Sequence, residues 1–173
     1  MPNQETRYRV VPLAKVHDRS AFSCGSQALD RYLQQHARQD AEKRVAAPFV
    51  LIEPPAEKVL GYYSLSASAV TADALPAEMR KKLPRYPRLP VILIGRLAVN
   101  QGHKGKGLGE FLLMDALHRC LSAAEQIAAM AVVVDAKDAA AEAFYRHFDF
   151  RPLQVAPVRM FLPMTVVAGL FPQ

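Results

Sequence analysis

Seven residues near the middle of the chain, His103–Gly109, combine three glycines with two lysines. An apolar run leads into them and an amphipathic run leads out, so they lie between a predicted strand and a predicted helix. A helix N-terminus presents unpaired amide N–H groups and the positive end of the helix dipole. Glycines allow positive φ and close approach of a ligand, and lysines add charge. We therefore predict a phosphate or pyrophosphate site here, with a ligand-free glycine turn as the alternative.

The glycine spacing excludes two common phosphate-binding motifs. The dinucleotide fingerprint G-x-G-x-x-G fails because Glu110 stands at its third glycine position, and nothing matches the Gly-Lys-Ser/Thr end of a P-loop. From Lys104 the spacing is K-x-x-G-x-G. It resembles the [Q/R]-x-x-G-x-[G/A] motif of the GNAT acetyltransferases, whose amides surround the pyrophosphate of acetyl-CoA. Lys104 departs from the usual Gln or Arg, but binding through amides does not need that side chain.

A second stretch, "DAKDAAAEAFYRHFDF", resembles another GNAT signature, a helix that ends in Phe-Tyr-x-x-x-x-Phe. Asp149 stands where the family usually has glycine. In the family this helix follows a strand that diverges from its neighbour, and the pantetheine arm of acetyl-CoA lies between the two strands. The resemblance implies that main-chain groups of Leu97, Ala98 and Val99 bind that arm. It also implies that the diphosphate is bound by the amides of Lys104, Gly105, Lys106, Gly107, Leu108 and Gly109.

The likeness is closer to one branch, the GNAT toxins of bacterial toxin–antitoxin modules. It rests on "FSCGSQALDRYLQQHA", "GYYSLSASAV", "LPRYPRLPVILIGRLAV" and "AKDAAAEAFYRHFDF", and it covers most of residues 8–165. This branch acetylates the α-amine of aminoacyl-tRNA with acetyl-CoA and so blocks translation. The resemblance implies charged tRNA as substrate, a cognate antitoxin of the ribbon-helix-helix type, and often a homodimer.

Tyr145 is the candidate catalytic residue, because a phenol is protonated at neutral pH and can donate a proton to a leaving thiolate. Helical spacing alone would make it a core aromatic; the Phe-Tyr pair in its matching context favours catalysis. No carboxylate stands out as a general base, since the candidates look like surface residues: Glu53, Glu57, Glu110 and Glu142. An α-amine has a pKa of roughly 8 and a lysine amine roughly 10.4, so a site without a base suits an α-amine better.

The chain carries a net charge of +6, which favours anionic partners, although solubility is an alternative explanation. One proline-rich segment holds five cations: Arg80, Lys81, Lys82, Arg85 and Arg88. Together with Arg38, Lys43 and Arg44, these residues are predicted to contact an RNA backbone, with a solvated face as the alternative. Arg96 lies near the expected site, and its partner is either the substrate or a structural carboxylate.

Apolar periodicity predicts an alternating pattern of strands and helices. Strands are expected at 10–13, 46–53, 59–69, 91–99, 128–134 and 158–166. Helices are expected at 26–42, 108–125 and 138–148, with a short one at 77–83. Ser23 or Ser26 could cap the first helix. The prediction is one domain over residues 1–173 with an α/β (α+β) fold, a mixed central sheet flanked by helices, as in the GNAT-like acyl-CoA N-acyltransferases. Strand 91–99 should be central, and the 91–134 unit should be a right-handed crossover.

Several classes of protein are disfavoured. The apolar runs are too short to span a bilayer, and the N-terminus lacks a secretory signal, so a cytoplasmic protein without membrane contact is expected. Neither the five histidines nor the cysteines show metal-ligand spacing. Cys24 and Cys120 are expected to be reduced thiols.

Two further functions remain open on the sequence alone. One is a GNAT enzyme that acetylates a small amine or a protein N-terminus. The other is a non-catalytic regulator that binds acyl-CoA.

Overall fold

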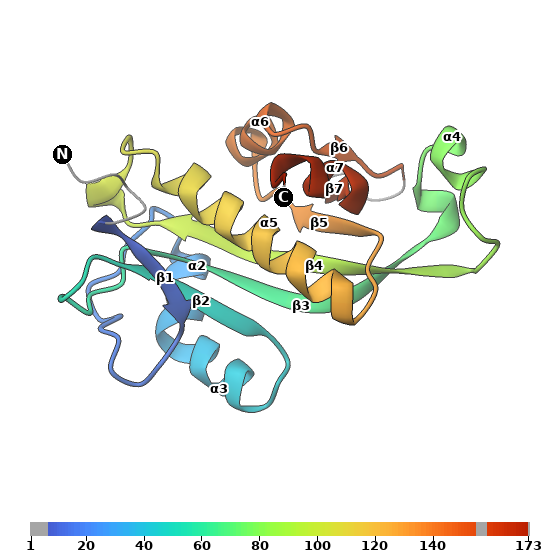
Figure 1. The fold of residues 1–173 in the computed structure, drawn as a ribbon. Coiled ribbons are helices and arrows are strands. Elements are labelled where there is room, and N and C mark those ends of the chain that lie inside the picture. Colours follow the sequence, from blue (N-terminus) through green and yellow to red (C-terminus); the bar gives the residue numbers. More distant parts are fainter. Residues whose placement is uncertain (1–6, 155–158, 173) are drawn as a thin grey trace. The chain divides into compact units, whose positions relative to one another are not determined.

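The computed structural model describes residues 7–154 and 159–172. Its helices and strands are labelled in Figure 1. The strands are β1 (Arg9–Pro12), β2 (Ala47–Ile52), β3 (Gly61–Thr71), β4 (Arg88–Val99), β5 (Ala131–Asp135), β6 (Arg151–Pro152) and β7 (Arg159–Pro163). The helices are α2 (Gln27–Arg31), α3 (Ala37–Glu42), α4 (Ala77–Arg80), α5 (Leu108–Gln126), α6 (Ala139–His147) and α7 (Met164–Leu170).

Over the described residues, seven strands form one mixed sheet in the order β1-β2-β3-β4-β5-β7-β6. β4 is therefore central, as its near-continuous apolar sequence predicted. It pairs in parallel with β5 through the register Ile92↔Val132 to Ile94↔Val134. Since α5 connects these two parallel strands, the predicted crossover is present, and its right-handed sense stays a prediction. The mixed sheet with flanking helices confirms the predicted fold class.

Contacts divide the chain into two compact units. The first contains Met1–Ser66 with Gly95–Ala116, and the second contains Ala67–Ile94 with Leu117–Gln173. Strands β3 and β4 and helix α5 each contribute residues to both units. Each unit has its own apolar core. The single domain over residues 1–173 stays a prediction.

In the first unit, neighbouring tyrosines of β3 face opposite sides of the sheet, because side chains alternate along a strand. Tyr62 is fully buried in a core with Phe22 and Leu33. Tyr63 donates a hydrogen bond from its hydroxyl to Asp115 of α5, over 2.6 Å. Helices α2 and α3 therefore cover one face of this part of the sheet, and the first turns of α5 cover the other (Figure 1).

The predicted helix 26–42 forms, but it contains a π-helical turn at Tyr32–His36 between α2 and α3. Ser26 caps its N-terminus by accepting a hydrogen bond from the Leu29 amide, which decides between the two serines considered. Within the turn the Ala37 amide donates to the Tyr32 carbonyl, five residues back. The wider turn buries Tyr32 while Leu33 and Ala37 also stay in the core. π-turns are rare and frequently occur at functional sites.

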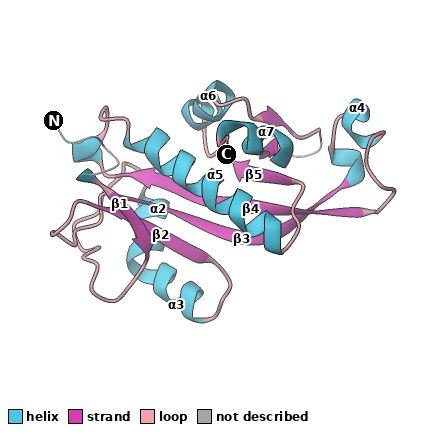
Figure 2. Ribbon diagram, viewed as in Figure 1, coloured by secondary structure: helices cyan, strands magenta, loops and turns pink. Residues whose placement is uncertain are grey.

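In the second unit, the end of the chain differs from the prediction. The strand expected at 158–166 is β7, which ends at Pro163, and residues 164–170 form helix α7 against β5 and β7 (Figure 2). Pro163 cannot donate a further ladder hydrogen bond, and the Met164 amide instead donates to the Met130 carbonyl. Position 158 lies outside the described residues. The short strand β6 was also missed, and β5 begins three residues later than predicted.

The helix in the proline-rich segment before β4 is also shorter than predicted. Helix α4 ends at Arg80 rather than at residue 83, and β4 begins at Arg88 rather than at Val91. Pro90 lies within this strand, and its carbonyl accepts a hydrogen bond from the Met130 amide.

Three further properties bear on function. Within the described residues, no helix combines the length and apolarity needed to cross a membrane. The same part of the chain holds no group of acidic, histidine or cysteine side chains that could bind a metal ion. Among the described residues, Cys24 and Cys120 form no disulfide, and both are buried. Burial raises the pKa of the Cys120 thiol to about 12, so it stays protonated and unreactive.

Candidate functional site

The glycine loop of the first unit has the backbone geometry of an anion site. Beyond the end of β4 at Val99, residues 104–107 lead into α5, and Gly105 and Gly107 adopt φ values of 82° and 77°. Residues other than glycine rarely adopt this left-handed backbone conformation. Within the described part of the chain, the amides of Gly105, Gly107, Leu108 and Gly109 donate to no acceptor. Four donors at the start of a 19-residue helix can therefore bind a diphosphate.

Hydrogen bonds hold the beginning of this loop against the segment before α2. The Gln101 amide donates to the Ser23 carbonyl over 2.8 Å, and the Ser23 amide donates to the Asn100 side chain over 3.1 Å. The Asn100 amide also donates to the Leu60 carbonyl over 2.8 Å. These bonds fix the direction in which the loop leaves β4.

The side chain of Lys104 differs from expectation. Its ammonium group donates to the Cys24 carbonyl over 2.8 Å, which ties the glycine loop to the same segment. The lysine was expected to add positive charge for a phosphate. In the structure its ammonium group instead joins the glycine loop to the segment before α2.

Replacing Lys104 with methionine should therefore lower the free energy of unfolding by about 1 kcal/mol, the value of one hydrogen bond. Urea denaturation measures the loss, with the exposed Lys15→Met as the matched control. A variant with unchanged stability but much weaker acetyl-CoA binding would show that the ammonium acts on the ligand instead.

His103, at the start of the loop, carries the one buried side-chain nitrogen or oxygen without a hydrogen-bond partner among the described residues, its Nδ1. Burial lowers the pKa of His103, and the charges of Lys106 and Lys58 lower it further, whereas Glu53 opposes the shift. The neutral imidazole is therefore the form that fits the folded loop.

This gives a pH dependence of stability. Below pH 6.5 the unfolded chain takes up a proton on His103 before the folded chain does, so the free energy of unfolding should fall as the pH drops toward 5. His103→Phe should flatten this part of the profile, as measured by chemical denaturation at a series of pH values. An unchanged slope would assign the effect to other groups.

Gly61 brings three elements of the first unit together next to the proposed pantetheine strand. A Cβ atom at this position would lie 2.8 Å from Leu112 of α5 and 3.0 Å from the Ala98 carbonyl. The leucine side chain could shift, but the carbonyl belongs to the backbone and the contact would be tighter than most real Cβ contacts, so glycine favours the close packing of β3, β4 and α5 here. The sequence analysis did not identify this role.

The partner of Arg96 is an aromatic ring, not a carboxylate. Its guanidinium carbon lies 3.4 Å from the centre of the Tyr32 ring, and no acidic side chain in the described chain forms an ion pair with it. Tyr32 in turn stacks on Tyr62, with ring centres 6.2 Å apart. The structural carboxylate considered for Arg96 is therefore not its partner. The sequence analysis did not identify the contact of Arg96 with Tyr32 or the stacking of Tyr32 on Tyr62.

Tyr145 belongs to the second unit, on helix α6, whose N-terminus is capped by Asp138. It is 6% exposed, and its ring contacts Phe144 and Phe150, with ring centres 5.2 and 5.4 Å apart. Its hydroxyl forms no hydrogen bond within the described residues. Burial, and less strongly the charge of Asp135, raise the pKa of Tyr145 above its usual value. The phenol is thus kept protonated, as a proton donor requires.

The turn after this helix accommodates a side chain where the family usually has glycine. Asp149 adopts a φ of 69°, and aspartate tolerates this left-handed conformation better than most residues. Nearby, Arg159 binds both carboxylate oxygens of Asp135, over 2.8 and 3.0 Å. The charge that opposes ionisation of Tyr145 is therefore held in place.

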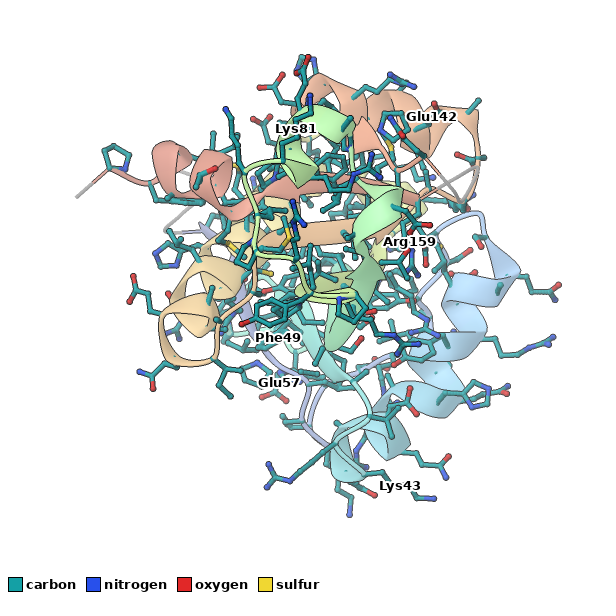
Figure 3. The ribbon with its side chains drawn as sticks, turned by 90° about the vertical axis from the view of Figure 1, so that its right-hand side faces the viewer. Lys43, Phe49, Glu57, Lys81, Glu142 and Arg159 are labelled. Carbon is teal, nitrogen blue, oxygen red and sulfur yellow. The ribbon has the colours of Figure 1, made fainter. Side chains whose placement is uncertain are left out.

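The five cations of the proline-rich segment lie on the surface of the second unit. All are exposed and none forms an ion pair within the described chain: Arg80, Lys81, Lys82, Arg85 and Arg88. Figure 3 labels Lys81, which directly follows α4. Among the other predicted RNA contacts, Arg38 pairs with Glu42 over 3.2 Å, which is a weak exposed pair.

The structure therefore brings Leu97, Ala98, Val99, the glycine loop and Arg96 together in the first unit. Tyr145 and the cations at 80–88 belong to the second unit. The four carboxylates named as surface residues are all at least partly exposed, and Glu53 and Glu142 pair with Arg7 and Arg146. The roles of these site residues stay predictions.

The chain is similar to several known proteins in sequence and in structure. The chain is 36% identical over 152 residues to a tRNA-acetylating toxin of Mycobacterium tuberculosis, a match that covers 88% of this chain and 89% of the relative. It superposes on AtaT complexed with acetyl-methionyl-tRNAfMet with a TM-score of 0.89 and 28% identity, covering 95% of this chain and 99% of that one. An AtaT variant bound to the C-terminus of the antitoxin AtaR and acetyl-CoA gives a TM-score of 0.81 at 25% identity, covering 96% and 99%.

The family itself is identified by residues 13–150, which match the acetyltransferase (GNAT) family. This match spans most of the 173 residues and includes both the glycine loop and the helix of Tyr145. The protein therefore belongs to the acetyltransferase (GNAT) family.

Proposed function

We propose that this protein transfers the acetyl group of acetyl-CoA to the α-amine of the aminoacyl group on charged tRNA, and so blocks translation. The observation that carries the donor half of this function is the glycine loop, where four unpaired amides meet the N-terminus of α5. This arrangement of donors suits a diphosphate, and acetyl-CoA carries one. The pairing of β4 with β5 ends at Ile94, which supports binding of the pantetheine arm along Leu97–Val99.

The acceptor half rests on the chain's relatives and on the chemistry of the site. The relative from Mycobacterium tuberculosis is called a tRNA-acetylating toxin, and AtaT is complexed with acetyl-methionyl-tRNAfMet. The candidate carboxylates lie at the surface, and two of them are engaged with arginines. An α-amine, with a pKa of roughly 8, is partly neutral at pH 7 and does not need a strong base.

In the proposed reaction the neutral amine attacks the thioester carbonyl and the C–S bond breaks. The thiolate of coenzyme A takes the hydroxyl proton of Tyr145, and the amine releases a proton to water. The pKa of Tyr145, raised by burial, keeps the phenol protonated until the thiolate forms. The phenolate then recovers its proton from solvent.

A single assay tests the whole proposal. The purified protein is incubated with acetyl-CoA and total charged tRNA, and the product is examined by mass spectrometry after ribonuclease treatment. N-acetyl-aminoacyl-adenosine is the expected product. Acetylation of free amines or protein N-termini without any tRNA product would favour the small-amine enzyme, and coenzyme A binding without any transfer would favour the regulator.

The exposed cations at 80–88 are proposed to bind the RNA backbone. The double variant Lys81→Glu/Lys82→Glu should raise KM for charged tRNA by roughly 10- to 100-fold and reduce the salt dependence of binding, because phosphate contacts are lost. The matched control is Arg9→Glu/Lys15→Glu, which makes the same charge change at exposed positions of the first unit. Equal effects of the two double variants would show that only net charge matters.

On the same comparison we propose that a cognate antitoxin inhibits the protein, as the AtaR-bound relative suggests. The ribbon-helix-helix class of that antitoxin, the homodimer and action in the cytoplasm stay predictions from the sequence.

A further inference from the structure

Arg96 is a cation without a counter-ion in the described chain. It lies on β4 immediately before Leu97, the first residue of the proposed pantetheine strand, and it is partly buried. At 3.4 Å from the ring centre, its guanidinium is in van der Waals contact with the face of Tyr32. Stacking of this kind stabilises the cation and fixes the plane of the guanidinium.

Two contacts fix the position of the Tyr32 ring on which Arg96 lies. The Tyr32 hydroxyl donates to Asp40 over 2.8 Å, and the ring stacks on Tyr62 at an interplanar angle of 18°. Tyr62 is itself anchored, because its hydroxyl donates to the Leu29 carbonyl over 2.7 Å. The π-helical turn that begins at Tyr32 gives the ring this position.

Neither tyrosine can neutralise the arginine. Burial, together with the bond to Asp40, raises the pKa of Tyr32 to about 12. Burial likewise raises the pKa of Tyr62 above its usual value. Both phenols are neutral at physiological pH, and their own hydroxyl hydrogens are already donated. The N–H groups at the edge of the Arg96 guanidinium therefore remain for a ligand.

Resting on the proposed function, we propose that Arg96, held flat on Tyr32, binds a phosphate at the 3′ end of the acceptor RNA and so positions the aminoacyl group beside Leu97–Val99. A planar guanidinium with fixed orientation binds two phosphate oxygens at once, which a lysine cannot do. An acceptor that is RNA supplies such a phosphate close to its reactive end. Tyr32 is a positioning residue, because it acts through Arg96.

The first test compares two acceptors that differ in phosphate. One is charged tRNA, and the other is aminoacyl-adenosine, which has the same ester and amine but no phosphate. Arg96→Gln should lower kcat/KM for charged tRNA by roughly 10- to 100-fold, mainly through KM, and leave kcat/KM for aminoacyl-adenosine unchanged. Arg9→Gln, on exposed β1, is the matched control and should match the wild type on both acceptors. Equal losses on both acceptors would overturn the proposal.

The second test does not require catalysis. Binding of a short RNA ending in the tRNA acceptor sequence is measured by fluorescence anisotropy at several salt concentrations. Loss of one phosphate contact should weaken binding and reduce the slope of log K against log salt by about 1 in Arg96→Gln. Wild-type affinity and slope in this variant would overturn the proposal. A wild-type protein that binds this RNA but does not acetylate charged tRNA would refute the proposed function, while this test of Arg96 still stands.

Variants of Tyr32 distinguish the contribution of its aromatic ring, on which Arg96 lies, from that of its hydroxyl group. Tyr32→Phe keeps the ring and should keep the RNA affinity, whereas Tyr32→Leu removes the ring and should reproduce most of the Arg96→Gln defect. Arg96→Lys, which keeps the charge but loses the planar fork, should fall between wild type and Arg96→Gln. Full affinity in Tyr32→Leu, with the fold intact by circular dichroism, would remove Tyr32 from this role.

Discussion

Tyr145→Phe should abolish most acetyl transfer, lowering kcat by roughly 10²- to 10⁴-fold, while the affinity for acetyl-CoA stays at the wild-type value. The substitution removes the hydroxyl that we propose as the proton donor, so the thiolate of coenzyme A would have to leave without a proton. Because this hydroxyl forms no hydrogen bond in the described chain and the ring is retained between Phe144 and Phe150, stability should hardly change. Stopped-flow transfer assays and calorimetric titration with acetyl-CoA measure the two quantities separately.

The matched control is Tyr86→Phe, which removes a hydroxyl from a tyrosine that is 63% exposed. It should retain full kcat. Wild-type kcat in Tyr145→Phe would exclude Tyr145 as the proton donor. Loss of acetyl-CoA binding in that variant would mean that its ring or hydroxyl contributes to the donor site rather than to the chemical step.

The second large effect is expected at the glycine loop. Gly107→Ala should weaken acetyl-CoA binding by roughly 10- to 100-fold, because a φ of 77° costs an alanine on the order of 1–3 kcal/mol and the loop would leave this conformation. Gly105, with a φ of 82°, should behave in the same way even though an added Cβ would meet no atom within 4 Å. Backbone conformation, not crowding, is therefore the cause at Gly105. Isothermal titration with acetyl-CoA measures the change.

Gly102→Ala provides the comparison, because Gly102 lies just before the loop, has no left-handed φ and has open space around an added Cβ. It should bind acetyl-CoA as the wild type does. If Gly102→Ala and Gly107→Ala weaken binding equally, general flexibility and not the left-handed backbone of the loop controls binding.

Local patterns predicted much of the fold. The apolar run of β4 identified the central strand, and the amphipathic run after Gly107 gave α5 to within about one residue. The serine at position 26 is the N-cap. These features depend on neighbours in sequence or on a simple period, so composition and spacing reveal them. The positive φ values at Gly105 and Gly107 followed from residue type in the same way.

The features that the sequence did not reveal depend on distant partners. The Arg96–Tyr32 contact joins residues 64 positions apart (96 − 32), and the Lys104–Cys24 bond joins residues 80 apart. No periodicity marks either pair. The π-turn at Tyr32–His36 adds one residue to a helical turn, which the spacing of apolar residues tolerated without a visible break. The final helix was missed because residues 159–166 are apolar enough to continue a strand, and only the proline at 163 signalled its end.

The hydrogen bonds between the 23–25 segment and the 100–104 segment have a consequence for the order in which the two substrates bind. Both segments lead into helices: one into the helix that holds the arginine platform, the other into the helix that starts at the diphosphate site. Gly25 belongs to the first of these segments and has a φ of 93°, and an added Cβ there would lie 3.0 Å from Gln101 of the second. Binding of acetyl-CoA at the glycine loop should therefore also reduce the motion of the segment that leads to Tyr32 and Arg96. We expect acetyl-CoA to bind first and tRNA second, to a surface that is already ordered.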